Sequence, residues 1–365
     1  MKTLLFTLEY PPFKGGVANY YGNLAAHWPR EEPLSILDNH QGRLLPRHGF
    51  LLWLSSLCTA GRKIRREKID YVLVGQILPL GTVTWILSFF RSFKYAVFLH
   101  GMDFSYALKK PRKRFLSGLI LKRADKIICA NSYVARQVRE FYPVGQKQII
   151  IVNPGVSALV PEIKTTISEN LKSRYNLTGK TVLLTLGRLV RRKGVDYTIK
   201  AVEAIPEPLI DNLIYFVIGA GPEEEALHRL VSPRFAAQII FLGGELSDDE
   251  KWAWLNLCDI FIMPSRDIDG DFEGFGIVYL EANLCGRPVI AGDSGGVRDA
   301  VIDGYNGLLV DPEDVGDIRR AIMELATDAD RRQQLGEQGR ARAQKEFSWD
   351  EQTARLITGL KNKNL

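Results

Sequence analysis

Short, continuous apolar segments alternate with longer amphipathic segments along most of the chain, and this alternation constrains the fold more than any other feature. Ten of the apolar segments have the length and β-branched composition of strands: TLLFTL (3–8), YVLV (71–74), YAVFL (95–99), IICA (127–130), IIIV (149–152), TVLLTL (181–186), IYFVIG (214–219), IIFLG (239–243), IFIM (260–263) and PVIAG (288–292). Strands that are apolar along their whole length are typical of parallel sheets with helices on both faces. The sequence therefore predicts an α/β protein.

The strand series is interrupted in its middle. Residues 157–180 are mostly polar and contain no strand-like segment, and a new series begins at residue 181. A chain of 365 residues is also longer than one hydrophobic core usually supports. We therefore predict two domains, residues 1–165 and 166–346, followed by a separate helix within residues 347–365.

Charge is unevenly distributed between the two halves. The first 164 residues contain 24 Lys and Arg against 10 Asp and Glu, including the basic clusters RKIRREK (62–68) and KKPRKR (109–114). Such a half attracts polyanions, which could be nucleic acid, anionic lipid or an acidic substrate. Alternatively, it is a solvated face that keeps the protein in solution. No nucleic-acid-binding motif accompanies the basic residues, so we expect no nucleic-acid partner.

Several classes of protein are disfavoured. The four cysteines are widely spread without a C-x-x-C pair, which predicts reduced thiols and neither a disulfide framework nor a zinc site. The N-terminus lacks the longer apolar core of a signal peptide. Residues 71–90 carry no charge, but glycines and a proline interrupt them, which favours a strand, a turn and a helix start over a membrane span.

Two glutamates eight positions apart, Glu273 and Glu281, stand out in residues 265–296. Gly274 and Gly276 let backbone N–H groups approach a ligand at the start of a predicted helix, where the helix dipole favours anionic groups. Glu281 lies among apolar residues and needs a partner, which the two hydroxyls of a ribose could provide. Alternatively, the two residues are a capping glutamate and a helix-face glutamate in an ion pair.

This segment resembles the E-x7-E signature of the family-four retaining glycosyltransferases, which include phosphatidylinositol mannosyltransferases. The match comprises Glu273, Gly274, Phe275, Gly276 and Glu281. The resemblance implies the GT-B fold, in which two Rossmann-like domains face each other across a cleft. It also implies that Glu273 and the following backbone amides face the transferred sugar, while Glu281 holds the ribose of the donor.

A basic segment, GRLVRRKG (187–194), follows the first strand of the second half. Arg188 and Lys193 are five positions apart across a turn and could converge on one polyanion, or they could belong to an ordinary basic surface loop. The segment has the spacing G-R-x4-K-G and resembles the family's basic loop. The resemblance therefore implies that Arg188 and Lys193 hold the diphosphate of the donor, whose charge grows as it leaves.

The N-terminal half contributes a glycine pair and a histidine. Gly15 and Gly16 open a predicted helix after the first strand, and their segment, P-P-x2-G-G, resembles the family's proline–glycine loop near the donor phosphate. His100 and Asp103 follow the strand YAVFL, at the strand end where ligands bind in such sheets. The family places a histidine against the donor sugar, which implies a catalytic role for His100 and an acceptor-orienting role for Asp103.

Three further implications rest on the resemblance. The turn at Gly219 approaches the nucleotide, and Leu242 lies beside the base. The partial G-x-G at Gly219 is by itself only weak evidence for dinucleotide binding. The helix within residues 347–363 crosses back onto the first domain. No cofactor is expected beyond the sugar nucleotide as co-substrate, and no metal site, because Asp267, Asp269 and Asp271 lie in one loop rather than as a D-x-D at a strand end.

Together these features predict a metal-independent, retaining hexosyltransferase that uses GDP-mannose, or a UDP-sugar, by front-face substitution. Three alternatives remain open: a soluble acceptor, a non-catalytic sugar-nucleotide-binding partner, and a sugar-nucleotide epimerase. The basic clusters flank the apolar stretches FLLWLSSL (50–57) and FLSGLILK (115–122). Basic and apolar surface together suit an anionic bilayer, so we expect a peripheral enzyme at the cytoplasmic face that glycosylates a lipid or lipid-linked acceptor.

Overall fold

The computed structural model describes residues 1–13, 15–42, 44, 54–145, 148–157, 160, 165–244 and 246–362. The chain divides into two compact units. The N-terminal unit comprises Met1–Gly155 together with Trp349–Leu365, and the C-terminal unit comprises Val156–Ser348. The sequence predicts the first division at 165/166, ten residues after its place in the structure. It predicts the second at 346/347, two residues before its place in the structure.

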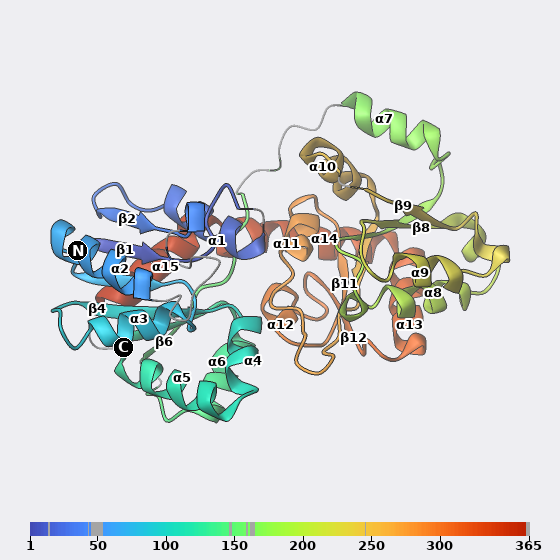
Figure 1. The fold of residues 1–365 in the computed structure, drawn as a ribbon. Coiled ribbons are helices and arrows are strands. Elements are labelled where there is room, and N and C mark those ends of the chain that lie inside the picture. The colour runs from blue at the N-terminus through green and yellow to red at the C-terminus, as the bar shows by residue number, and fades with distance from the viewer. Residues whose placement is uncertain are drawn as a thin grey trace. The chain divides into compact units, whose positions relative to one another are not determined.

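The N-terminal unit is a six-stranded, all-parallel sheet with strand order β2-β1-β3-β4-β5-β6 (Figure 1). Its strands are β1 (Thr3–Phe6), β2 (Leu34–Leu37), β3 (Tyr71–Val74), β4 (Lys94–Leu99), β5 (Lys126–Cys129) and β6 (Ile149–Ile151). Its helices are α1 (Gly16–Ala26), α2 (Leu54–Glu67), α3 (Leu80–Leu87), α4 (Met102–Leu108), α5 (Pro111–Arg123), α6 (Ser132–Phe141) and α15 (Trp349–Lys361), with the 3₁₀ turn η1 (His40–Gly42).

The C-terminal unit is also a six-stranded parallel sheet, with strand order β12-β11-β10-β7-β8-β9. Its strands are β7 (Thr181–Leu186), β8 (Leu213–Ile218), β9 (Ile239–Leu242), β10 (Ile260–Met263), β11 (Val289–Gly292) and β12 (Gly307–Val310). Its helices are α7 (Thr165–Arg174), α8 (Val195–Glu203), α9 (Glu224–Leu230), α10 (Asp248–Leu257), α11 (Ile277–Leu284), α12 (Val297–Ala300), α13 (Val315–Thr327) and α14 (Ala329–Glu346), with 3₁₀ turns η3 (Arg191–Lys193), η4 (Ile210–Asn212) and η5 (Pro233–Phe235).

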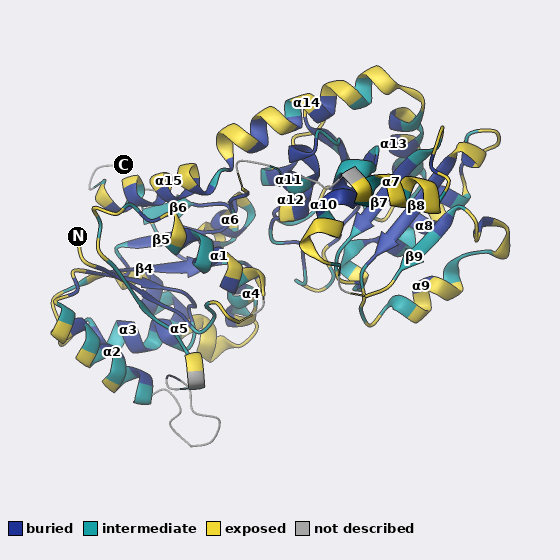
Figure 2. Ribbon diagram, turned by 90° about the horizontal axis from the view of Figure 1, so that it is seen from above, coloured by how far each residue is buried: buried dark blue, intermediate teal, exposed yellow. Residues whose placement is uncertain are grey.

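Helices cover both faces of each sheet, which explains why the strands read as continuous apolar runs (Figure 2). In the C-terminal unit, Leu184 and Phe216 face a core shared with α10 and α11, whereas the neighbouring Leu183 and Tyr215 face a core shared with α8 and α13. This alternation buries both sides of every central strand. The predicted fold of two parallel α/β domains is confirmed.

All ten predicted strands are present, and two more were missed. β2 and β12 are four-residue edge strands interrupted by Ser35 and begun by Gly307, whereas the edge strands β6 and β9 are apolar throughout. The predicted interpretation of residues 71–90 also holds, because the segment forms β3, a turn and α3. In the part of the chain that the structure describes, no helix is long and apolar enough to cross a membrane.

The final helix, α15, belongs to the N-terminal unit although it is the last element of the chain (Figure 1). Trp349 at its start packs against Gly155, where an added Cβ would lie 2.6 Å from the indole ring, and its ring meets Tyr20 at 5.3 Å between centroids. Further along the helix, Leu356, Ile357 and Leu360 join the core that α1 shares with the sheet.

Candidate active site

The strand order of the C-terminal unit defines where a ligand would bind. From β7 the chain continues to β8 and β9 on one side of the sheet and later to β10, β11 and β12 on the other, so the order reverses between β7 and β10. Ligands of open parallel sheets bind at such a switch point, beyond the carboxyl ends of the strands. The loop 187–194 after β7 and the loop 264–276 after β10 both leave the sheet at this point.

Lys193 and Glu273 meet across the switch point. The Lys193 Nζ atom lies 2.5 Å from Glu273 Oε2, and the two side chains are only 13% and 11% exposed. The Glu273 carbonyl oxygen accepts a hydrogen bond from the Gly296 N–H at 3.0 Å, which holds the glutamate backbone in place. Two of the predicted catalytic residues, eighty positions apart, are therefore in direct contact.

Arg188 lies at the same edge but differs from Lys193 in its environment. Its side chain is exposed and has no hydrogen bond or ion pair within the described ranges. A guanidinium without a protein partner at a sheet switch point can bind a phosphate group bidentately. The structure thus places Arg188 near the strand end as predicted, although it does not bring the Arg188 and Lys193 side chains into contact.

A second ion pair, formed by a buried guanidinium, joins the loops around Lys193. The Arg266 guanidinium contacts Asp196 at 3.0 and 2.9 Å, and the Arg266 N–H donates to the Arg192 carbonyl at 2.8 Å. Arg266 is almost fully buried. Because Asp196 lies in the first turn of α8, which follows Lys193 and Gly194, these bonds join the β10 loop to the turn that carries Lys193. The sequence analysis did not identify Arg266 or Asp196.

Glycine is required at the start of α11. Gly276 has a φ of 78°, and a Cβ there would lie 2.2 Å from Tyr279 Cε2. No side-chain hydrogen bond caps α11 within the described residues. The Tyr279 N–H donates to the Gly276 carbonyl at 2.9 Å, which leaves the N–H groups of Ile277 and Val278 to face an anionic ligand. Gly274 lies in the same loop. Phe275 is buried against Phe347, with ring centroids 5.7 Å apart, so only its backbone can approach a ligand.

Glu281, on α11, is paired with Lys251 of α10. The Lys251 Nζ atom lies 2.7 Å from Glu281 Oε1, and both side chains are largely buried. The predicted need for a partner is therefore met by a lysine within the protein. No spacing rule connects residues thirty positions apart, which is why sequence reasoning did not identify Lys251.

Gly219 and Leu242 meet at the ends of β8 and β9. The Gly219 N–H donates to the Leu242 carbonyl at 3.2 Å, and a Cβ on Gly219 would lie 2.0 Å from the Gly187 carbonyl oxygen. The three strand ends that carry Gly187, Gly219 and Leu242 are therefore packed backbone to backbone. Leu242 itself is half-buried.

The N-terminal unit places His100 at the end of β4, in a shell of aromatic rings. Tyr21 Oη lies 2.7 Å from His100 Nε2 and 2.7 Å from the Gly75 carbonyl. A carbonyl only accepts, so the Tyr21 hydroxyl donates to Gly75 and His100 Nε2–H donates to Tyr21, which leaves Nδ1 as the acceptor. Desolvation lowers the pKa of His100 to about 4, so its imidazole is neutral at pH 7.

Asp103 lies in the first turn of α4, next to His100. One carboxylate oxygen accepts hydrogen bonds from the backbone N–H groups of His100 and Gly101, both at 3.0 Å. The other oxygen, Oδ2, is buried without a hydrogen-bond partner within the described residues. Burial raises the pKa of Asp103 to about 6. An acceptor oxygen of this kind is suited to receive a hydrogen bond from a ligand hydroxyl.

Gly15 and Gly16 open α1 after β1, at the switch point of the N-terminal sheet, where the order reverses between β1 and β3. Both glycines are exposed and no side chain caps the helix. Glu9 lies beside them: a Cβ on Gly15 would be 3.7 Å from Glu9 Oε2. Burial raises the pKa of Glu9. Glu9 is not among the residues predicted from the sequence.

Metal-ligand clusters are absent from the described ranges: no group of three His, Cys, Asp or Glu side chains there could hold a metal ion. Asp271 of the 267–271 loop instead lies 3.7 Å from the Arg192 guanidinium. The four cysteines are free thiols, three of them buried.

Two family models match the chain. The model described as Glycosyltransferase Family 4 matches residues 14–158, and the model described as Glycosyl transferases group 1 matches residues 167–342. Among solved structures, the Anabaena protein HepE, determined in complex with UDP, superposes with a TM-score of 0.80 at 18% identity, covering 99% of each chain. The two family models identify the chain as a glycosyltransferase, and its two parallel α/β units have the GT-B fold. The chain belongs to glycosyltransferase family 4.

Similar proteins include two GDP-mannose-dependent enzymes. The alpha-(1-6)-phosphatidylinositol monomannoside mannosyltransferase of Mycolicibacterium smegmatis is 29% identical, over 97% of this chain and 96% of its own. The monoacylated alpha-(1-6)-phosphatidylinositol monomannoside mannosyltransferase of Corynebacterium glutamicum is 29% identical over 99% and 98%. The similarity extends over almost the full length of all three chains.

Proposed function

We propose that the protein is a retaining, metal-independent mannosyltransferase that transfers mannose from GDP-mannose to a phosphatidylinositol-type lipid acceptor. The observation that carries the proposal is the Lys193–Glu273 pair at the switch point of the C-terminal sheet, beside the uncapped start of α11. The names of the full-length relatives favour GDP-mannose and a phosphatidylinositol lipid. No cofactor takes part besides the sugar nucleotide itself.

The donor occupies the C-terminal unit in this proposal. Arg188, Lys193 and the N–H groups at the start of α11 bind the diphosphate. Glu281 accepts hydrogen bonds from the ribose hydroxyls through the carboxylate oxygen that Lys251 leaves available. Glu273 accepts a hydrogen bond from a hydroxyl of the sugar. Gly219 and Leu242 line the nucleotide through their backbones.

Transfer proceeds at the front face of the sugar. The bond between the anomeric carbon and the diphosphate oxygen breaks as the acceptor oxygen bonds to the same face, and the departing diphosphate takes the acceptor's proton. Negative charge grows on the diphosphate in this step, and two cations with preorganised N–H groups stabilise it without a metal. A carboxylate nucleophile is the alternative, and Glu273 would be its candidate, but its ion pair with Lys193 lowers its nucleophilicity.

The N-terminal unit receives the acceptor. Asp103 Oδ2, buried and unpartnered, accepts a hydrogen bond from an acceptor hydroxyl, and neutral His100 accepts one from the donor sugar through Nδ1. Gly15 and Gly16 approach the donor phosphate. The basic residues of this unit hold the enzyme at the anionic, cytoplasmic surface of a membrane, where its lipid acceptor lies.

A donor screen tests the proposal. GDP-mannose at one hundred times its Kd should raise the free energy of unfolding by about 2.7 kcal/mol, and UDP-glucose or UDP-N-acetylglucosamine at the same concentration should raise it less. The Glu281→Gln variant should lose most of this stabilisation, whereas Glu273→Gln should keep it and lose turnover. Of the two glutamates, Glu281 contacts the ribose, which does not react, and Glu273 contacts the sugar that is transferred.

A transfer assay follows for the same proteins. The wild type should mannosylate a phosphatidylinositol acceptor with EDTA present, and the product should be the α-anomer. Stabilisation by UDP-sugars alone would reject GDP-mannose, and a β-linked product would reject front-face substitution. Donor binding with no transfer to any acceptor would instead identify a non-catalytic binding protein.

The pH dependence of kcat/KM tests the role of Asp103. Activity should fall as the pH drops below about 6, because the carboxylate becomes protonated at its raised pKa and can no longer accept at both oxygens. His100, with its pKa lowered to about 4, stays neutral throughout this range. In Asp103→Asn the backbone bonds can persist, so overall activity should be lower and the acidic limb absent. An unchanged acidic limb in that variant would remove Asp103 from the acceptor site.

A further inference from the structure

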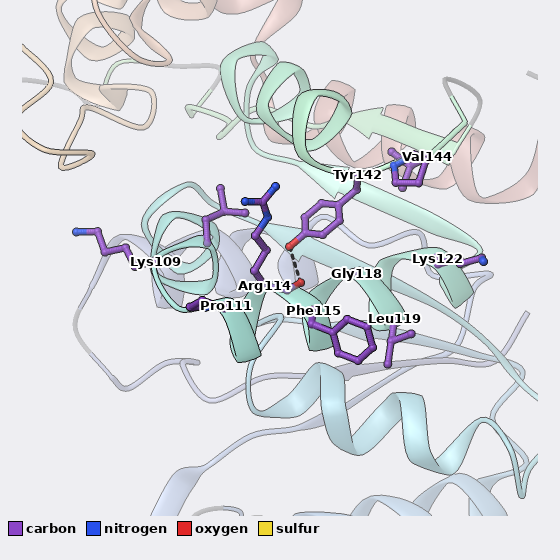
Figure 3. Close-up of a pocket in the computed structure, with 11 residues that line it drawn as sticks. Lys109, Pro111, Arg114, Phe115, Gly118, Leu119, Lys122, Tyr142 and Val144 are labelled. Carbon is purple, nitrogen blue, oxygen red and sulfur yellow. Dashed lines mark hydrogen bonds between the residues drawn. The ribbon is translucent and has the colours of Figure 1, made fainter.

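A cavity of about 580 Å³ lies in the N-terminal unit, and none of the residues assigned to glycosyl transfer lines it. It is bounded by the end of α4, one side of α5 and the segment after α6 (Figure 3). Its apolar lining comprises Leu108, Pro111, Phe115, Leu119, Pro143 and Val144. Tyr142 closes one wall: its hydroxyl donates to the Arg114 carbonyl at 2.9 Å, and its ring packs closely on Gly118.

The helix α5 has apolar residues on two faces. Ile120 and Leu121 are fully buried in the unit, as expected for a helix that covers a sheet. Phe115 and Leu119, four positions apart, form a second apolar face along the cavity, and the Phe115 side chain is 71% exposed. A surface helix normally presents polar residues there, so a second apolar face indicates a site for an apolar ligand.

Cations surround this apolar cavity. Lys109, Arg114 and Lys122 contribute to its lining, and in Figure 3 the two lysines lie at opposite ends of the row of residues. The Arg114 guanidinium is also held 5.0 Å above the Phe141 ring. Among the residues that the structure describes, no acidic side chain lines the cavity. The charge therefore complements an anionic group, and the apolar lining complements a hydrocarbon chain.

We propose that this cavity binds one molecule of an anionic phospholipid. The acyl chain lies along Phe115 and Leu119, and Arg114 holds the phosphate bidentately, with the two lysines adding positive charge. This goes beyond the proposed function, because the site requires neither donor nor transfer. It also gives the unit an orientation at a membrane: α4 rises about 8 Å from Asp103 to Leu108 at the cavity, so the acceptor edge lies one short helix from the bound lipid.

Monomeric lipid distinguishes this site from general attraction to a membrane. The probe is dihexanoyl-phosphatidylglycerol below its micelle concentration, titrated into the full-length protein by calorimetry. We expect saturable binding of one molecule. Arg114→Gln/Lys122→Gln should weaken it about 25-fold, taking about fivefold for each cation near a lipid phosphate.

The matched control is Arg112→Gln/Lys113→Gln, which removes the same charge from the same helix. Both residues are exposed and neither lines the cavity, so binding should change about twofold or less. Equal loss in the two double variants would overturn the proposal in favour of non-specific electrostatics. Equally tight binding of glycerol 3-phosphate would show a phosphate site without a chain site, and equally tight binding of dihexanoyl-phosphatidylcholine would exclude selection for anionic lipid.

Stabilisation by GDP-mannose is measured on the same variants. It depends on the C-terminal unit and should be unchanged in both. Loss of lipid binding with intact donor binding in Arg114→Gln/Lys122→Gln would therefore support this site without testing the proposed function. Absence of stabilisation by GDP-mannose in the wild type would contradict the proposed function without testing this site.

Discussion

Replacing Lys193 with alanine should lower kcat by about a hundredfold to a thousandfold, which corresponds to ~2.7–4 kcal/mol of lost transition-state stabilisation. The ammonium group lies 2.5 Å from Glu273 in a largely buried position, so its charge is poorly screened by water. The substitution also leaves the Glu273 carboxylate without its partner, next to where the leaving diphosphate gains negative charge. Single-turnover transfer from GDP-mannose measures the chemical step directly.

The matched control is Arg191→Ala, in the same 3₁₀ turn. Arg191 is exposed, and its removal takes away the same charge two residues from Lys193. We expect near-normal turnover in this variant, with the fold of both variants checked by thermal unfolding. If Lys193→Ala retained more than about a tenth of wild-type turnover, the lysine would not stabilise the leaving group in the way proposed.

Trp349→Ala should destabilise the N-terminal unit by about 3–5 kcal/mol, the usual cost of removing a buried Trp or Phe side chain. Trp349 is only 5% exposed, and its indole contacts Gly155 and Tyr20. Its removal would therefore leave a cavity in the core. Hydrogen exchange followed by mass spectrometry should show faster exchange in peptides of β1, β3 and β4. Peptides of β7, β8 and β10, in the C-terminal unit, should be unchanged.

Thr358→Ala on the same helix is the control. Thr358 is exposed, so this change should stay within about 0.5 kcal/mol of the wild type. Accelerated exchange spread equally over both units in Trp349→Ala would show that the two units unfold together, and a loss below about 1 kcal/mol would show that α15 contributes little to the N-terminal core.

The sequence predicts the central strands well, for a physical reason. Strands such as β3 and β8 are buried on both faces, so all their residues are apolar. The resulting continuous apolar segment is a clear strand signal in the sequence. The edge strand β2 offers no such signal: all four of its residues are half-buried, and one of them is Ser35. β12 begins with a glycine and is likewise covered only in part.

The candidate site divides in a similar way. The family motifs identify Lys193 and Glu273, but their contact joins positions eighty residues apart and follows only from the strand order. Lys251 and Arg266 belong to no motif, and only the fold brings them to Glu281 and Asp196. Asp103 Oδ2 is buried without a hydrogen-bond partner among the described residues. This property depends on the tertiary structure, and no local sequence pattern predicts it.

The discontinuous N-terminal unit has a consequence for how the protein is made. Residues 1–155 leave the ribosome first, but Trp349, Leu356 and Leu360 complete their core from the far end of the chain. At about 5–20 residues per second, the α1 side of that sheet waits about 10–40 s for its last helix. The C-terminal unit, encoded wholly in between, can complete its own fold during this interval. The N-terminal core is thus incomplete until residues 349–360 have been synthesised, and until then a nascent chain leaves the apolar face that α15 covers open to chaperones.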